Sequence, residues 1–152
     1  MTPTARRPRT LLALLVVLAG TACDDPQGPS AGTVLRPASI SFFDLDPAIT
    51  LPDSAVAGVP VEVTVESYGD GCTELADTEV AASGLAPVLR PLVRVPAPGA
   101  EVVCPSVLRT LVHRVSLTFP TPGTATITVE GRRDPERTVQ VESRPLRVVA
   151  AP

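Results

Sequence analysis

The sequence of 152 residues has few of the side chains that carry out chemistry. It contains no tryptophan, no lysine, one tyrosine and one histidine, and its only methionine is Met1. Copper sites in proteins combine two or more imidazoles with sulfur ligands, so a copper centre of this kind is excluded. Neither a G-x-S-x-G motif nor a glycine-rich phosphate loop is present. We therefore predict a protein that is not an enzyme and that has no cofactor and no metal site.

The overall charge of the chain is acidic. The formal net charge is −3 and the isoelectric point lies near 5.1. Proteins that bind nucleic acid neutralise phosphates with a clustered basic surface, which this composition does not supply. We therefore expect no nucleic-acid partner. Because net charge keeps proteins soluble and apart, we also expect a monomer.

The first 22 residues have the pattern of an export signal. Three arginines and no acidic residue precede the apolar run LLALLVVLA, from Leu11 to Ala19. A basic start followed by roughly 7–15 apolar residues is typical of a signal peptide. A membrane-spanning helix needs about 20 apolar residues, so this run is too short for a permanent span. We expect residues 1–22 to direct export and to be removed.

Small residues lead from the apolar run into a cysteine, in the order Gly20-Thr21-Ala22-Cys23. This tetrapeptide resembles the lipobox of bacterial lipoproteins. The resemblance implies that Cys23 is acylated and holds the exported protein on a membrane of the bacterial cell envelope, facing the periplasm or the exterior. Residues 23–37 are polar and rich in proline and glycine, so we expect a flexible tether. The alternative is ordinary secretory cleavage after Ala22, with Cys23 left as a free thiol.

The two other cysteines, Cys72 and Cys104, favour a disulfide bond. An exported chain folds in an oxidising compartment, and acylation of Cys23 would leave no third thiol to compete. The bridge would close a loop of 33 residues and add about 3.7 kcal/mol of stability in the chain-entropy model. A metal site made of Cys72, Cys104 and His113 is the alternative, but it has no CxxC pair and no defined fourth ligand.

Alternating apolar and polar residues predict an all-β domain over residues 38–150. Val61, Val63 and Val65 alternate with polar residues, and a second alternation runs through residues 125–130. A period of two is typical of half-buried strands, and valine and threonine favour strands. Turns rich in glycine and proline separate the predicted strands. These strands cover residues 38–45, 59–68, 74–82, 86–95, 108–119, 124–131 and 138–149.

The segment FPTPGTATITV, from Phe119 to Val129, resembles the penultimate corner and strand of bacterial immunoglobulin-like and fibronectin-like domains. The resemblance implies an antiparallel immunoglobulin-like β-sandwich of about seven strands. Two inner faces of valine, leucine and phenylalanine would form its core. We also expect the disulfide to join a strand end to a loop, and residues 132–137 to form an exposed loop between the last two strands.

The single histidine, His113, is in phase with Leu111, Val115 and Leu117 and is expected to point toward the apolar side of its strand. We interpret it as a partly buried imidazole hydrogen-bonded to backbone. A catalytic base or metal ligand is the alternative, although the nearby Ser116 would face the opposite side of the strand. Acidic residues gather after residue 69, and we interpret them as a solvated surface, with a calcium site as the alternative.

The stretch from Leu85 to Val103 is apolar and contains four prolines. We interpret it as an irregular edge strand whose prolines prevent unwanted pairing. The alternative is a recognition loop, held by the disulfide, that offers Arg90 and Arg94 to a partner.

Together these patterns predict a non-catalytic, lipid-anchored binding or structural module of the bacterial cell envelope. The membrane would hold it through the lipid on Cys23, and its partner would be an unidentified protein or glycan of the envelope. The alternative is an envelope regulator such as a protease inhibitor, acting through residues 85–103.

Overall fold

The computed structural model describes residues 32–152 except residues 44, 46, 48 and 82–83. The expected signal peptide, Cys23 and most of the expected tether lie outside the described residues. Every regular element within them is a β-strand, so the predicted all-β class is confirmed. The described part of the chain accordingly contains no helix with the length and hydrophobicity of a membrane span.

The described residues form ten strands. These are β1 (Thr33–Pro37), β2 (Ser39–Phe42), β3 (Ile49–Thr50), β4 (Ser54–Val56), β5 (Pro60–Gly69), β6 (Glu74–Ala81), β7 (Val88–Pro96), β8 (Arg109–Thr118), β9 (Gly123–Asp134) and β10 (Thr138–Val149). The seven strands expected from the sequence correspond to β2 and to β5 through β10. The three that were not expected are short, with five residues or fewer.

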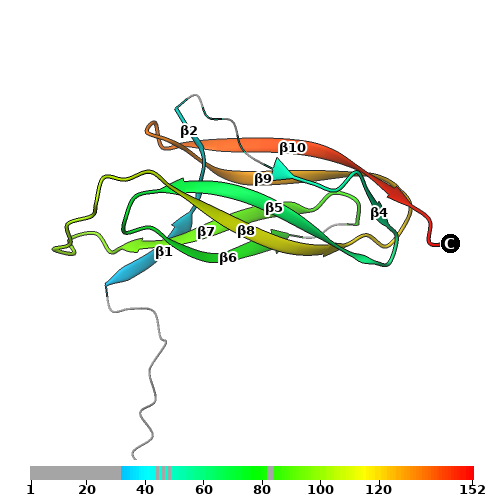
Figure 1. Cartoon of the computed structure of the whole chain (residues 1–152), viewed down its shortest axis with the longest axis horizontal. Coiled ribbons are helices and arrows are strands. Elements are labelled where there is room, and N and C mark those ends of the chain that lie inside the picture. Colours follow the sequence, from blue (N-terminus) through cyan, green and yellow to red (C-terminus); the bar gives the residue numbers. More distant parts are fainter. Residues whose placement is uncertain (1–31, 44, 46, 48, 82–83) are drawn as a thin grey trace, which may run out of the picture.

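Strand pairing connects all ten strands into one sheet, which divides at β2 into two layers. The pairs β2–β9, β7–β9 and β4–β10 are parallel, so the sheet is mixed and not purely antiparallel as expected. In the first layer, β7 pairs with β6 on one side and with β1 and β9 on the other, and β9 continues to β10 and β4. In the second layer, β5 pairs with β8 and β3. β2 pairs with both β9 and β5 and so connects the layers. The β5–β6 turn and the β7–β8 loop lie at one end of the molecule, and the C-terminus lies at the other (Figure 1).

Alternate side chains of both layers form the main core. Val63 and Val65 of β5 belong to the same buried cluster as Ala125, Ile127 and Val129 of β9. These are the positions that the alternation of the sequence predicted to be buried. Each Å² of apolar surface removed from water stabilises the fold by about 25 cal/mol. The period-two pattern therefore identifies the inner faces correctly.

The described domain includes residues before Ala38, where the sequence was expected to begin folding. Residues 33–37 form β1 and pair along β7, and the backbone N–H of Ala97 donates to the carbonyl of Gly32 at 2.6 Å. The proline and glycine content around this strand is typical of a tether. Because five residues are too few to show an alternation, the sequence does not reveal this strand, which forms by pairing with β7.

β7 is not the edge strand that residues 85–103 were expected to form, because it has neighbours on both sides. Pro91 is buried where the neighbour changes from β9 to β1, and its carbonyl accepts a hydrogen bond from the N–H of Ala38 at 2.8 Å. The pairing with β6 is irregular between Leu75 and Thr78. Proline lacks a backbone N–H, so an interrupted ladder tolerates it inside a sheet.

Residues 132–137 are only partly the exposed loop that was expected. β9 continues through Asp134, and the turn before β10 comprises residues 135–137. The extra length of β9 pairs with β2, and the Asp134 carboxylate accepts hydrogen bonds from the Ser39 hydroxyl and from Arg132. The charged residues suggested solvent exposure, but β2 covers one side of this segment.

Candidate functional site

A disulfide joins Cys72 to Cys104, as the cysteine count predicted, with the two Cα atoms 5.3 Å apart. Cys72 lies in the turn between β5 and β6, and Cys104 lies in the loop between β7 and β8. The bridge therefore joins two loops and not a strand end to a loop. The N–H of Gly71 also donates to the carbonyl of Pro105 at 3.0 Å, so a hydrogen bond beside the bridge connects the same two loops.

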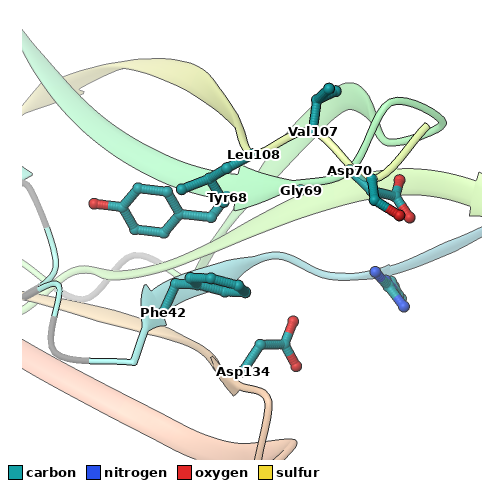
Figure 2. A pocket seen from close by; sticks show the side chains of 9 residues that line it. Phe42, Tyr68, Gly69, Asp70, Val107, Leu108 and Asp134 are labelled. Carbon is teal, nitrogen blue, oxygen red and sulfur yellow. The ribbon is translucent and has the colours of Figure 1, made fainter. Parts of the chain in front are cut away.

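A groove of about 430 Å³ opens beside this bridge. We call it the Tyr68 groove. The residues that line it come from β1, β2, β5, β9 and the loops at the disulfide end: Arg36, Phe42, Tyr68, Gly69, Asp70, Ser106, Val107, Leu108 and Asp134. Figure 2 shows the Tyr68 and Phe42 rings facing the groove, with the carboxylates of Asp134 and Asp70 farther along it. The ring centroids of Phe42 and Tyr68 are 6.4 Å apart.

The polar groups of the groove are held in place by the surrounding backbone and side chains. One oxygen of Asp70 accepts hydrogen bonds from the N–H of Cys72 at 3.0 Å and from the hydroxyl of Thr73 at 2.8 Å. These contacts form the turn that follows β5. Asp134 is held in turn by Ser39 and Arg132. Both carboxylates are therefore fixed before any ligand arrives, which lowers the entropy cost of binding.

Arg36 and Tyr68 are partly removed from water in this groove. Burial lowers the pKa of Arg36, as does the charge of Arg132, while Asp134 and Asp70 raise it. Burial also raises the pKa of Tyr68, with a further contribution from Glu66. At neutral pH the guanidinium is charged and the phenol is protonated, so both can donate hydrogen bonds. No carboxylate of the described residues forms an ion pair with Arg36.

The β7–β8 loop, residues 97–108, adds apolar side chains on the outside of the groove. Val107 and Leu108 line the groove and are exposed, as is Val102. Val103, directly before the bridged Cys104, is 96% exposed. An exposed apolar cluster of this kind marks an interaction surface more often than a scattered single residue does.

Arg90 and Arg94, the expected partner contacts, lie on the outer side of β7 and do not line the Tyr68 groove. Nε of Arg90 donates to Glu130 at 2.7 Å, and this hydrogen bond raises the pKa of Arg90. Arg94 lies opposite Leu35 of β1 and Glu74 of β6. A smaller hollow of about 220 Å³ lies along Arg90. The structure therefore does not bring these two arginines together with the disulfide-held loop.

His113 is buried in the core, so its expected direction is confirmed. It is 2% exposed, with Nε2 hydrogen-bonded with the Ser67 hydroxyl at 2.8 Å and Nδ1 3.4 Å from the Thr78 hydroxyl. Burial lowers the pKa of His113, while a backbone hydrogen bond at Ala76 opposes this effect. The imidazole is neutral at pH 7. Its partners include two hydroxyls and not backbone alone.

The contact between Ser67 and His113 has the atoms of a catalytic pair but not the access. Both side chains are buried, so no substrate reaches the Ser67 hydroxyl. The sequence drew attention to Ser116 and not to Ser67, although Ser67 continues the buried alternation of Val63 and Val65. Among the residues that the structure describes, no three His, Cys, Asp or Glu side chains are grouped to hold a metal ion.

The groove itself was not predicted, because its residues come from segments that are distant in sequence. Asp70 was noted only as one of the acidic residues after residue 69, and Asp134 only as part of the expected loop 132–137. Phe42 and Tyr68 are two of the four aromatic residues that the chain contains, and their proximity depends on the pairing of β2 with β5. Comparison with known proteins supplies no relative from which a role could be transferred: no family model, curated protein or solved structure matches the chain.

Proposed function

We propose that this protein is a non-catalytic binding module that a lipid on Cys23 holds on a membrane of the bacterial cell envelope. The observation that carries the binding role is the Tyr68 groove, where a partly desolvated Arg36 lies with two aromatic rings and two fixed carboxylates. Ligand pockets typically measure about 300–1,000 Å³ and combine apolar walls with a few convergent polar groups. The groove has both properties.

The chemistry of the groove favours a chain-like ligand that carries a carboxylate. Arg36 can bind a carboxylate through two parallel hydrogen bonds, a geometry for which the planar guanidinium is suited. Asp70 and Asp134 can accept hydrogen bonds from N–H or O–H groups farther along the ligand. The Phe42 and Tyr68 rings offer apolar surface between them. A peptide segment or the peptide-bearing part of an envelope glycan has this combination of groups.

The proposed location in the cell envelope is supported by the export signal and by the immunoglobulin-like interpretation of the domain. Small residues before Cys23 resemble a lipobox, and Gly32, the first described residue, lies on the surface where a tether can reach it. The two-layer arrangement, in which the long pairs β5–β8, β6–β7 and β9–β10 are antiparallel, supports the immunoglobulin-like interpretation of the domain, although β2–β9, β7–β9 and β4–β10 are parallel. Because β-sandwiches host many functions, the proposed binding role is based on the Tyr68 groove and not on the fold.

The binding role can be tested with the protein's own fluorescence. Tyr68 is the only tyrosine and there is no tryptophan, so intrinsic emission reports on the groove. Titration of the purified protein with soluble peptidoglycan fragments, and with peptides that end in a free carboxylate, should give a saturable change in emission. The Arg36→Gln variant should lose this change. The Arg147→Gln variant, altered at an exposed arginine of β10, should keep it. No saturable change with either ligand would contradict the role assigned to the groove.

The anchor can be tested by fractionation of the cells that make the protein. We expect the wild-type protein in the membrane fraction and the Cys23→Ser variant in the soluble or secreted fraction, because the variant lacks the acylated thiol. Stable anchoring requires more than one acyl chain. The lipobox resemblance implies that Cys23 carries more than one. A wild-type protein found free of membranes, or a variant that stays bound, would contradict the anchor.

A second candidate function is inhibition of an envelope protease. The observation in its favour is the exposure of Val103 beside the disulfide-bonded Cys104. Residues 88–96 belong to β7 and are paired on both sides, and the carbonyls of Leu85 and Pro87 accept hydrogen bonds from β9, so residues 97–103 are the part of the expected stretch that could enter a protease. A panel of exported proteases that prefer small apolar residues tests this function. Inhibition that Val103→Asp abolishes and Val59→Asp preserves would support it, and no inhibition by the intact protein would remove it.

A further inference from the structure

Exposed apolar side chains gather at the disulfide end of the molecule. Val102 and Val103 in the β7–β8 loop are 55% and 96% exposed, and Val34 and Leu35 of β1 are also exposed nearby. At the opposite end, Val59 precedes β5 and is 49% exposed, between Gly58 and Pro60. Apolar exposure on one end marks a surface that meets a protein or a membrane.

The loop that carries these valines is constrained by a disulfide and by backbone hydrogen bonds. The disulfide at Cys104 and the hydrogen bond from Gly71 to Pro105 fix its second half. Within the first half, the N–H of Ala100 donates to the carbonyl of Ala97 at 3.0 Å. Glu101 is the single charged residue between positions 97 and 108. A fixed and nearly uncharged loop loses little entropy when it makes an apolar contact.

The chain enters the domain at this same end. The carbonyl of Gly32 accepts a hydrogen bond from the N–H of Ala97, at the base of the β7–β8 loop. Cys23 precedes Gly32 by nine residues, and nine residues span at most about 32 Å when fully extended. A lipid on Cys23 would therefore keep the loop near the bilayer. The C-terminus lies at the end of the molecule away from β1 (Figure 1).

From these three observations we infer that Val102 and Val103 insert into the interfacial layer of the same bilayer that holds the lipid anchor. This inference rests on the acylated Cys23 of the proposed function. The contact orients the domain with its disulfide end on the membrane. The Tyr68 groove, which shares the β7–β8 loop, then lies close to the membrane surface. Ligands of the groove would be met in the layer of the envelope next to that membrane.

The absence of tryptophan makes the contact directly measurable. In the acylated protein, Val103→Trp introduces a single tryptophan at the tip of the loop, and Val59→Trp introduces one at the opposite end as the matched control. Each protein is reconstituted in vesicles of phosphatidylethanolamine and phosphatidylglycerol, with and without bromine on the acyl chains. Bromine quenches tryptophan on contact. Val102→Trp serves as a second reporter if Val103→Trp does not fold.

We expect blue-shifted emission from Val103→Trp and quenching of about half of it by brominated lipid, since interfacial insertion reaches roughly 5–10 Å into the headgroup and acyl boundary. Val59→Trp should show neither effect. Unshifted emission at the tip would overturn the inference. A blue shift without quenching would also overturn it, because the tip would then contact protein.

A failure of the loop contact can be distinguished from the absence of the lipid on Cys23. Intact mass shows directly whether Cys23 of the purified protein is acylated. If it is not, the free Cys23 thiol can be coupled to a maleimide-bearing lipid in the same vesicles, which restores the attachment at the same residue. Quenching of Val103→Trp in that sample would support the loop contact even though the proposed natural anchor had failed. An unquenched tip would overturn the loop contact by itself.

Discussion

His113 and Ser67 form a buried polar contact at the meeting point of three strands. Their hydrogen bond joins β8 to β5, and the contact of His113 with Thr78 reaches β6. β6 and β8 lie side by side while each pairs with another strand, so this contact links the two layers. Buried polar groups that are fully satisfied specify one arrangement of a core, because any other arrangement leaves them unpaired.

The burial of His113 predicts a loss of stability in mild acid. In the folded protein the pKa of His113 lies below its ordinary value of 6.5. Below pH 6.5 the His113 side chain of the unfolded chain therefore binds a proton that the folded chain does not bind. The free energy of unfolding should fall as the pH drops below 6.5 and should level off, for this residue, below the folded pKa. Carboxylates titrate mostly at lower pH.

Urea unfolding at about pH 7.5 and about pH 5.5 checks this prediction, since the ordinary pKa of histidine lies between them. The His113→Gln variant should be less stable by about 1–3 kcal/mol at the higher pH, because buried hydrogen bonds are lost. Its stability should change less between the two pH values than that of the wild type. An equal change in both proteins would show that His113 does not cause the acid sensitivity.

Gly131 is required where β2 crosses β9. A Cβ atom added there would lie 2.7 Å from Cγ2 of Ile40 and 2.8 Å from the carbonyl oxygen of Ala38. Ile40 is fully buried and cannot move aside. We predict that Gly131→Ala lowers the free energy of unfolding by about 1–3 kcal/mol, as overpacking does in other cores.

The matched control for Gly131→Ala is Thr121→Ala in the exposed turn before β9. An exposed substitution of this kind usually changes stability by no more than about 0.5 kcal/mol. Thermal unfolding followed by circular dichroism compares the two variants. Equal melting temperatures for Gly131→Ala and the wild type would mean that β2 can shift away from β9, and the crossing would then be looser than the structure shows.

Among the elements, the long strands are the part of the fold that the sequence predicts well. β5, β8 and β9 have ten or more residues, and their alternation identifies both the strands and their buried faces. For β10 the sequence predicts the strand but not its buried face, since Val139 and Val141 are exposed. The cysteine count also predicts the disulfide. These features depend on local pattern or on elimination, and neither requires knowledge of which strands are neighbours.

The features that the sequence did not predict depend on pairing between distant segments. β1 has no pattern of its own and is defined by β7. Pro91 suggested an edge strand, but the change of neighbour from β9 to β1 accommodates it inside the layer. The Tyr68 groove is assembled from five segments in the same way. The site was missed because its residues share a location and not a motif.

The disulfide between the β5–β6 turn and the β7–β8 loop should contribute strongly to stability. It closes a loop with a sequence separation of 32, for which the chain-entropy model gives about 3.7 kcal/mol. Replacement of both Cys72 and Cys104 by serine should lower the urea midpoint accordingly. Hydrogen exchange should also increase in residues 97–108, because the loop loses its covalent attachment. An unchanged midpoint would contradict this role of the bridge.

At the scale of the whole molecule, the two ends differ in character. The disulfide end carries the Tyr68 groove, the exposed valines and the point where the chain enters from the side of Cys23. The other end carries the C-terminus (Figure 1). This asymmetry is what we expect of a domain that is held at one end and works close to its attachment. The proposed attachment and orientation of the domain therefore depend most on the state of Cys23.

The intact mass of the native protein, purified from bacterial membranes, tests that state directly. The measurement is made with and without reduction followed by thiol alkylation. The account predicts a chain that begins at Cys23 with added acyl mass and gains two alkylated thiols only after reduction. A chain that begins at Cys23 without lipid would contradict the anchor. Two thiols that react before reduction would contradict the disulfide-closed domain on which the groove depends.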